Sequence, residues 1–205
     1  LERASVPEWL ASRRADAAIE IGSLMVDDLP LEKVRARVRW EGAGFEASEV
    51  SAHYSEGSIL ARLTGNLRRS APAYRMAMRY RGLGWMGGNW SGRTTLESSG
   101  TGRELLRNLR LNGTFRARSV ALAAETEARD VSGNYAFSMQ GKLPTFHFSD
   151  MILTLGDVSF KGQGETGADG RVHLDLSDGQ SQMRLSATVS PFQLELVHDR
   201  PQGAL

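Results

Sequence analysis

Strict alternation of apolar and polar residues is the feature that most constrains how this chain folds. Segment 33–41 is the clearest case: its apolar positions are Val34, Ala36, Val38 and Trp40, and its charged positions are Lys33, Arg35, Arg37, Arg39 and Glu41. A period of two sends successive side chains to opposite faces of a β-strand. The segment therefore predicts a strand with one apolar face and one charged face.

The same period recurs along most of the chain, with turn residues between the segments. The alternating segments are 17–21, 45–54, 59–63, 74–80, 111–117, 131–139, 146–155, 158–160, 172–176, 183–189 and 192–196. The phase slips by one residue at Ser48–Glu49 and again at Ser149–Asp150. A slip inside a strict alternation predicts a β-bulge or a short break in the strand.

Two segments depart from this period and predict short helices. Pro7–Arg14 begins with a proline suited to the first helical turn. In Thr101–Leu109, Thr101 and Glu104 form a capping box, and three leucines follow at helical spacing. We therefore divide the chain into residues 1–100 and 101–205, the latter a helix followed by a β-meander that continues the first part.

These patterns predict an all-β fold: a long, strongly curved antiparallel sheet with one or two short helices. The segments are long for a sandwich or a small barrel. An open groove with an apolar interior fits them equally well, and periodicity leaves the choice between a closed and an open sheet undecided.

Composition excludes several classes of function. The formal net charge of +1 gives no bulk electrostatic case for nucleic-acid binding, and the absence of cysteine excludes disulfides and thiolate chemistry. The longest apolar run, Val120–Ala124, cannot cross a bilayer. The chain begins without an initiator Met or a signal-peptide pattern, so we expect a fragment of a longer protein.

No motif in the sequence predicts catalysis, a cofactor or a metal ion. Two G-x-G-x-x-G matches, Gly82–Gly87 and Gly162–Gly167, run into strand-like or turn residues, whereas a phosphate site needs a helix there. His147 and His173 alternate with apolar residues and are expected to face solvent. The arginines of 33–41 and 75–81 favour a solvated sheet face over a lipid-headgroup site.

One passage resembles a known family. Residues 88–117 read GNWSGRTTLESSGTGRELLRNLRLNGTFRA, which is similar to the "G…L.S.G.G…LL.NL.G.F.A" passage of AsmA-family proteins. Segment 10–38 resembles the family's "I.IG.L…LPL..V…V" unit, and later segments resemble its repeats. The resemblance implies a bacterial envelope protein in the periplasm, held in the inner membrane by an N-terminal anchor that this sequence lacks. It also implies a β-groove with an apolar interior that serves outer-membrane lipid homeostasis.

We therefore expect a non-enzymatic groove that binds or conducts a phospholipid or another envelope lipid, without cofactor, metal or nucleic acid. The expected lipid-facing residues lie at apolar positions of the alternation: Val34, Val38, Trp40, Leu63, Met76, Met78, Tyr135, Phe137, Met139 and Leu185. The alternative is an envelope assembly module whose apolar face is its own closed core. Such a module would bind a protein partner by edge-strand pairing.

Overall fold

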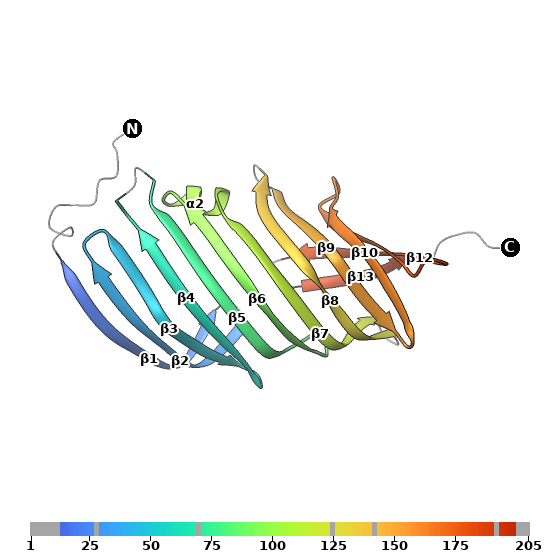
Figure 1. Cartoon of the computed structure of the whole chain (residues 1–205), viewed down its shortest axis with the longest axis horizontal. Coiled ribbons are helices and arrows are strands. Elements are labelled where there is room, and N and C mark those ends of the chain that lie inside the picture. Colours follow the sequence, from blue (N-terminus) through green and yellow to red (C-terminus); the bar gives the residue numbers. More distant parts are fainter. Residues whose placement is uncertain are drawn as a thin grey trace.

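The computed structural model describes residues 13–26, 29–68, 71–123, 126–140, 143–190 and 193–199, and these form one antiparallel sheet. The strands are β1 (Arg14–Val26), β2 (Leu29–Glu41), β3 (Gly44–Tyr54), β4 (Gly57–Asn66), β5 (Ala73–Trp85), β6 (Gly88–Ser99), β7 (Arg110–Ala123), β8 (Thr126–Gln140), β9 (Leu143–Leu155), β10 (Val158–Thr166), β11 (Arg171–Ser177), β12 (Gln182–Ser190) and β13 (Gln193–Asp199). Each strand pairs with the next along the chain, so β1 and β13 are the two edges and the sheet stays open (Figure 1). The predicted all-β antiparallel fold is confirmed.

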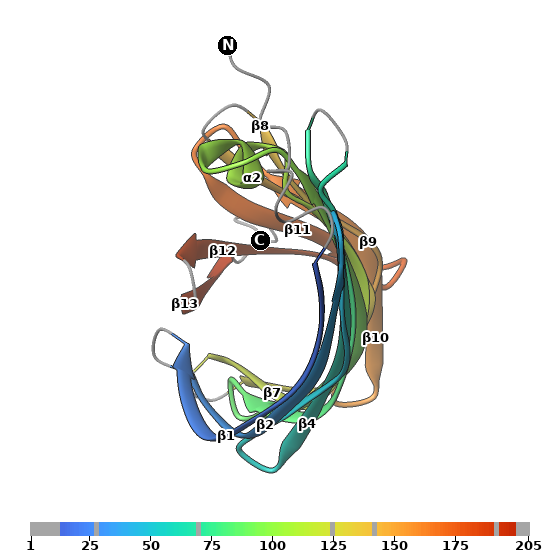
Figure 2. The ribbon, with the colours of Figure 1, turned by 90° about the vertical axis from the view of Figure 1, so that its left-hand side faces the viewer.

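The sheet curves around one hollow side. Viewed along the stack of strands, the long strands trace an arc, and β12 and β13 cross the hollow side of that arc (Figure 2). Apolar residues of β7, β8 and β9 pack there against those of β11 and β12 in the core cluster: Ala117, Val120, Ala128, Val131, Met151, Leu153, Leu176, Met183 and Leu185. The concave face is therefore the apolar face, and its C-terminal end is covered by the chain itself.

Both predicted phase slips are bulges within continuous strands. Glu49 in β3 has a φ of 53°, and the register between β3 and β4 shifts between Ala47 and Val50. Asp150 in β9 has a φ of 51°, and the register against β8 shifts there too. A bulge adds a residue on one strand and increases its bend and twist, so these sites help each strand to curl while apolar residues stay on one face.

The helix expected at Thr101–Leu109 is a single turn, α2 (Arg103–Arg107). Its N-cap is Gly102 with a φ of 54°, not Thr101, and no side chain caps it. Half of the capping box is present, since the Thr101 amide donates to Glu104 at 3.3 Å. The leucine stripe is not buried: Leu106 is 64% exposed. Strands β6 and β7 pair directly on either side of α2, so one sheet runs through the division at residue 100.

The first predicted helix falls mostly outside the described residues, and Arg14 begins β1. Within the part of the chain that the structure describes, no helix combines the length and apolar character needed to span a membrane.

Candidate functional site

An unbroken ladder of apolar residues crosses the concave face from β1 to β9. Direct cross-strand partners link its members, which are Ala17, Val38, Ala47, Leu63, Met76, Leu96, Leu111, Phe137 and Phe146. We call this set the apolar ladder. None of its side chains is fully buried, because over β1–β6 no described element covers them. The ladder therefore forms the floor of an open trough and not the interior of a closed core.

The two ends of the concave face differ in exposure. At the β1 end, Ile19 is 40% and Ile21 is 37% exposed, although both are large and apolar. At the other end, Leu153 and Leu185 are 2% and 3% exposed within the core cluster. One end is thus sealed by β11 and β12, while the other leaves apolar surface open to a binding partner.

Aromatic rings lie flat on this face because glycines stand beside them on neighbouring strands. A Cβ on Gly92 would come within 2.7 Å of the Tyr80 ring, and one on Gly113 within 2.6 Å of the Tyr135 ring. Large side chains that cover strand glycines are a known way to build curved sheets. The glycines here let bulky rings form a smooth floor where side chains at those positions would block it.

A small polar spot interrupts the apolar floor near its middle. The hydroxyls of Thr94 and Tyr135 share a hydrogen bond of 2.5 Å, and Thr94 is only 4% exposed. Burial raises the pKa of Tyr135, and the bond to Thr94 partly offsets this rise. Burial, and then the nearby Tyr135, raises the pKa of Tyr80 far above its usual 10.0. Both phenols stay neutral, and their hydroxyls are available as hydrogen-bond donors or acceptors.

The expected lipid-facing residues lie on this concave face, in two different settings. Nine of them are half-buried on the open or partly covered part of the concave face: Val34, Val38, Trp40, Leu63, Met76, Met78, Tyr135, Phe137 and Met139. Leu185 instead lies inside the core cluster, so it serves packing of β12 against β7, β8 and β9. The indole nitrogen of Trp40 is buried without a hydrogen-bond partner among the described residues.

The convex face carries the charges, and most of them are paired across strands. On β2, the basic side chains meet acidic ones from β1: Arg37 and Arg39 lie 3.5 and 3.6 Å from Asp16, and Arg35 lies 3.6 Å from Glu20. Exposed pairs of this kind contribute about 0–1 kcal/mol each. As expected, this stripe is a solvated face, and its charge is locally neutralised.

Sequence reasoning missed one polar trio on the outer face of β11 and β12. His173 Nδ1 lies 2.9 Å from Ser186 Oγ, and its Nε2 lies 3.1 Å from Asp169 Oδ2. Serine, histidine and aspartate in this order match the groups of a nucleophilic triad. However, Ser186 is only 5% exposed, and the Asp169 carboxylate also accepts the Arg171 backbone amide in the β10–β11 turn. The trio therefore fastens this turn to β12, and only the register of the strands reveals it.

The two glycine motifs lie in hairpins. Gly82–Gly87 spans the end of β5 and its turn into β6, and Gly162–Gly167 spans the end of β10. A Cβ on Gly162 would come within 1.9 Å of the Asp175 carbonyl oxygen. These glycines serve close strand packing and turns, as the sequence predicted.

The geometry defines a class of protein: a single, open, strongly curved antiparallel sheet with an apolar concave face and a charged convex face. No family model matches the chain, and no curated protein or solved structure is significantly similar to it. Among the described residues, no group of three or more histidine, aspartate or glutamate side chains is placed to hold a metal ion.

Proposed function

We propose that the concave face binds the acyl chains of a lipid and shields them from water. The observation that carries this proposal is the apolar ladder, which runs over β1–β9 without a polar member and stays partly exposed. Each CH₂ group moved from water onto such a surface contributes about 0.8 kcal/mol. Burial of these CH₂ groups is enough to hold the acyl chain of the lipid, so the protein needs no catalytic group for this function.

The polar spot supports the choice of a lipid over a purely hydrocarbon ligand. Thr94 and Tyr135 share one hydrogen bond, which leaves one of their two hydroxyl hydrogens free, and Tyr80 adds another donor nearby. Neutral donors in an apolar trough suit an uncharged acceptor such as an ester carbonyl. In line with the resemblance to the AsmA family, we propose a bacterial periplasmic setting, an inner-membrane anchor in the full-length protein and a role in outer-membrane lipid homeostasis.

Two variants on one strand test the trough. Leu63 belongs to the apolar ladder, whereas Leu60 on the same strand points to the convex face, where it is 58% exposed. We expect native mass spectrometry of the purified chain to detect bound phospholipid, Leu63→Asp to lose it, and Leu60→Asp to keep it. Circular dichroism establishes that both variants fold, and Phe137→Asp provides a second ladder variant. A lipid-free wild-type chain, or equal lipid in the folded Leu63→Asp and Leu60→Asp variants, would overturn the proposal.

A second function is favoured by the free edge of the sheet. β1 offers 13 residues that, among the described strands, pair only with β2, and it contains no proline. A long edge of this kind is a template for an added strand from a protein partner. If the chain acts by edge pairing, Ala18→Pro abolishes partner capture and leaves lipid content unchanged. Loss of lipid on Leu63→Asp with unchanged partner capture supports the trough instead.

A further inference from the structure

Two arginines face each other on the convex side at the middle of the sheet. Arg79 of β5 and Arg93 of β6 are direct cross-strand partners, and Arg81 lies two residues further along the same face of β5. Like charges in this relation repel each other. Neither Arg79 nor Arg93 makes an ion pair or a hydrogen bond with any described residue. The pair therefore concentrates positive charge that the described part of the chain leaves uncompensated.

Other arginines of the same face are compensated, so this pair is not a general property of the surface. Arg62 lies 2.8 Å from Glu46, Arg75 lies 3.5 Å from Glu97, and Arg116 lies 3.3 Å from Asp130. The Arg75–Glu97 pair lies further along the same two strands, β5 and β6, and the other two pairs lie on the strands to either side. Arginines to either side of Arg79 and Arg93 have acidic partners. The Arg79–Arg93 pair is therefore a local site of positive charge where an anion would be bound favourably.

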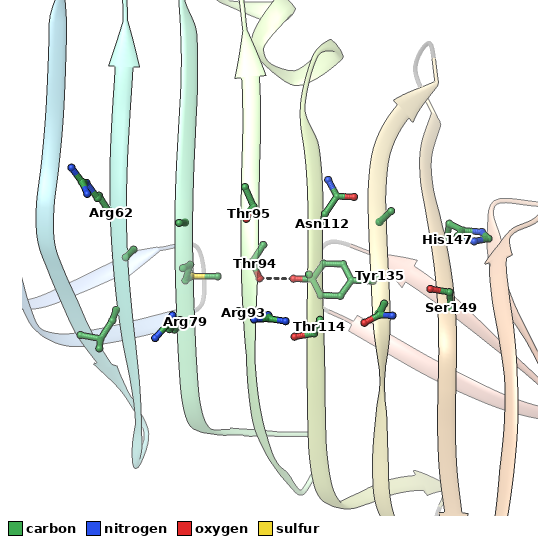
Figure 3. A pocket seen from close by; sticks show the side chains of 17 residues that line it. Arg62, Arg79, Arg93, Thr94, Thr95, Asn112, Thr114, Tyr135, His147 and Ser149 are labelled. Atoms are coloured by element: carbon green, nitrogen blue, oxygen red, sulfur yellow. Dashed lines mark hydrogen bonds between the residues drawn. The ribbon is translucent and has the colours of Figure 1, made fainter.

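The surroundings of the pair form a shallow site. Arg79 and Arg93 line a depression of about 780 Å³, and most of its lining residues belong to the convex face by their place in the strand alternation (Figure 3). The small side chains of Ala77 and Thr95 occupy the adjacent row, and Thr114, the partner of Arg93 on β7, adds a hydroxyl donor. The next residue in the row, Asn134, donates its amide to Asp150 at 2.7 Å, so the cationic part of the site ends there.

We propose that Arg79, Arg93 and Thr114 form a binding site for a phosphate group. Each guanidinium offers a planar fork of donors that fits two oxygens of one phosphate, and two opposed guanidiniums balance the two negative charges of a phosphate monoester. A single carboxylate carries one negative charge and would neutralise only one of the two guanidiniums. The site lies on the face opposite the apolar trough, so it takes a ligand of its own and does not depend on the lipid proposal.

Titration with inorganic phosphate tests the site. The arginine Nε–H resonances of the full chain are followed by NMR as phosphate is added, first for the wild type and then for R79Q/R93Q. The matched control is R37Q/R39Q, which removes two convex-face charges that are already paired with Asp16. We expect saturable binding that weakens about tenfold or more in R79Q/R93Q and stays unchanged in R37Q/R39Q. No saturable binding, or an equal loss in both double variants, would overturn the proposal.

Vesicles identify the source of the phosphate. Flotation is compared between phosphatidylcholine vesicles with and without phosphatidic acid, using the same variants. Flotation that needs phosphatidic acid, and that R79Q/R93Q alone abolishes, supports a lipid headgroup as the source. Saturable phosphate binding without such flotation supports a soluble phosphorylated ligand. Flotation that both double variants retain, together with no phosphate titration, contradicts a site at Arg79 and Arg93.

Discussion

The ring of Phe45 on β3 covers Gly65, its direct partner on β4, so closely that a Cβ at Gly65 would stand 2.0 Å from the ring edge. Phe45 in turn stacks on Trp40 of β2, with ring centroids 5.7 Å apart. The absent side chain at Gly65 is thus what lets an aromatic floor continue from β2 across β4. The position of the Phe45 ring on the concave face therefore depends on this glycine.

Substitution of Gly65 by alanine tests this relationship. The added methyl has no room beside a ring held by stacking, so we expect a loss of about 1–3 kcal/mol in the free energy of unfolding. The control is Gly22→Ala on β1, where a Cβ would meet nothing within 4 Å. Denaturant unfolding of both variants measures the difference. Equal stability of the two variants would contradict the proposed packing role of Gly65.

The Thr94–Tyr135 hydrogen bond gives a second prediction. Tyr135→Phe leaves the Thr94 hydroxyl buried without a partner, which costs about 1–3 kcal/mol. In Thr94→Val/Tyr135→Phe no unpaired hydroxyl remains, so we expect the double variant to be at least as stable as Tyr135→Phe. A double-mutant cycle measured by urea unfolding checks this. Strictly additive losses would show that the two hydroxyls do not stabilise each other.

The raised tyrosine pKa values predict sensitivity to alkali. Both Tyr80 and Tyr135 have a higher pKa in the folded chain than the usual 10.0, so the folded state holds its protons longer than the unfolded state. Their contribution to stability is complete below pH 10.0 and is lost as the pH rises through the folded-state pKa values. The melting temperature, measured from neutral to strongly alkaline pH, should therefore decrease once the pH exceeds 10.0. It should decrease less steeply in Tyr80→Phe/Tyr135→Phe. An identical slope in this variant would assign the alkaline loss to other groups.

The alternating strands and two of the bulges could be predicted from the sequence because each rests on local periodicity. The register shifts of β2 against β3 near Arg35, and of β5 against β6 between Tyr80 and Leu83, leave no such slip in the alternation and were not predicted. A period of two fixes which face a residue joins, and the slips at Glu49 and Asp150 mark the points where one extra residue keeps the apolar face aligned. The N-cap of α2 was predicted one residue too early: Thr101 looked like the cap, but Gly102, with a φ of 54°, takes that position.

The fold-back of β11 and β12 could not be predicted in the same way. Leu63 on the open floor and Leu185 in the core cluster occupy equivalent positions in their alternating segments, yet only Leu185 is sealed. Which part of an apolar face is covered depends on contacts between distant strands, and alternation carries no record of them. The partnership of His173 with Ser186 depends in the same way on the register between β11 and β12.

The bulge at Glu49 gives a prediction about backbone strain. Its φ of 53° is unfavourable for a side chain with a Cβ but not for glycine. We therefore expect Glu49→Gly to keep or raise the melting temperature. Ser48→Gly, one residue earlier and with no positive φ, should lower stability by about 0.5–1 kcal/mol. Equal destabilisation by both glycines would show that residue 49 is not strained.

The turn between β11 and β12 predicts the response to acid. The backbone amides of Ser181 and Gln180 donate to Asp178 Oδ1 at 2.6 and 2.8 Å, and these bonds hold the pKa of Asp178 below its usual 3.8. Because the folded-state pKa is depressed, this carboxylate stabilises the fold above pH 3.8, and the contribution is lost as the pH falls through the folded-state value. Asp178→Ala should therefore lower the melting temperature at neutral pH and flatten its decline in acid.

The control for this turn is Asp157→Ala, in the turn between β9 and β10. Asp157 is fully exposed, and its carboxylate lies 4.0 Å from Arg129 with no backbone amide bound to it. The variant should keep the acid response of the wild type, because no backbone donor there depends on the charge.

Since β11 and β12 carry Leu176 and Leu185 into the core cluster, a weakened turn also loosens the cover at the C-terminal end of the concave face. Hydrogen exchange at β11 and β12 should accordingly rise in Asp178→Ala before exchange at β5 and β6 does, and simultaneous rises would contradict a local role for the turn.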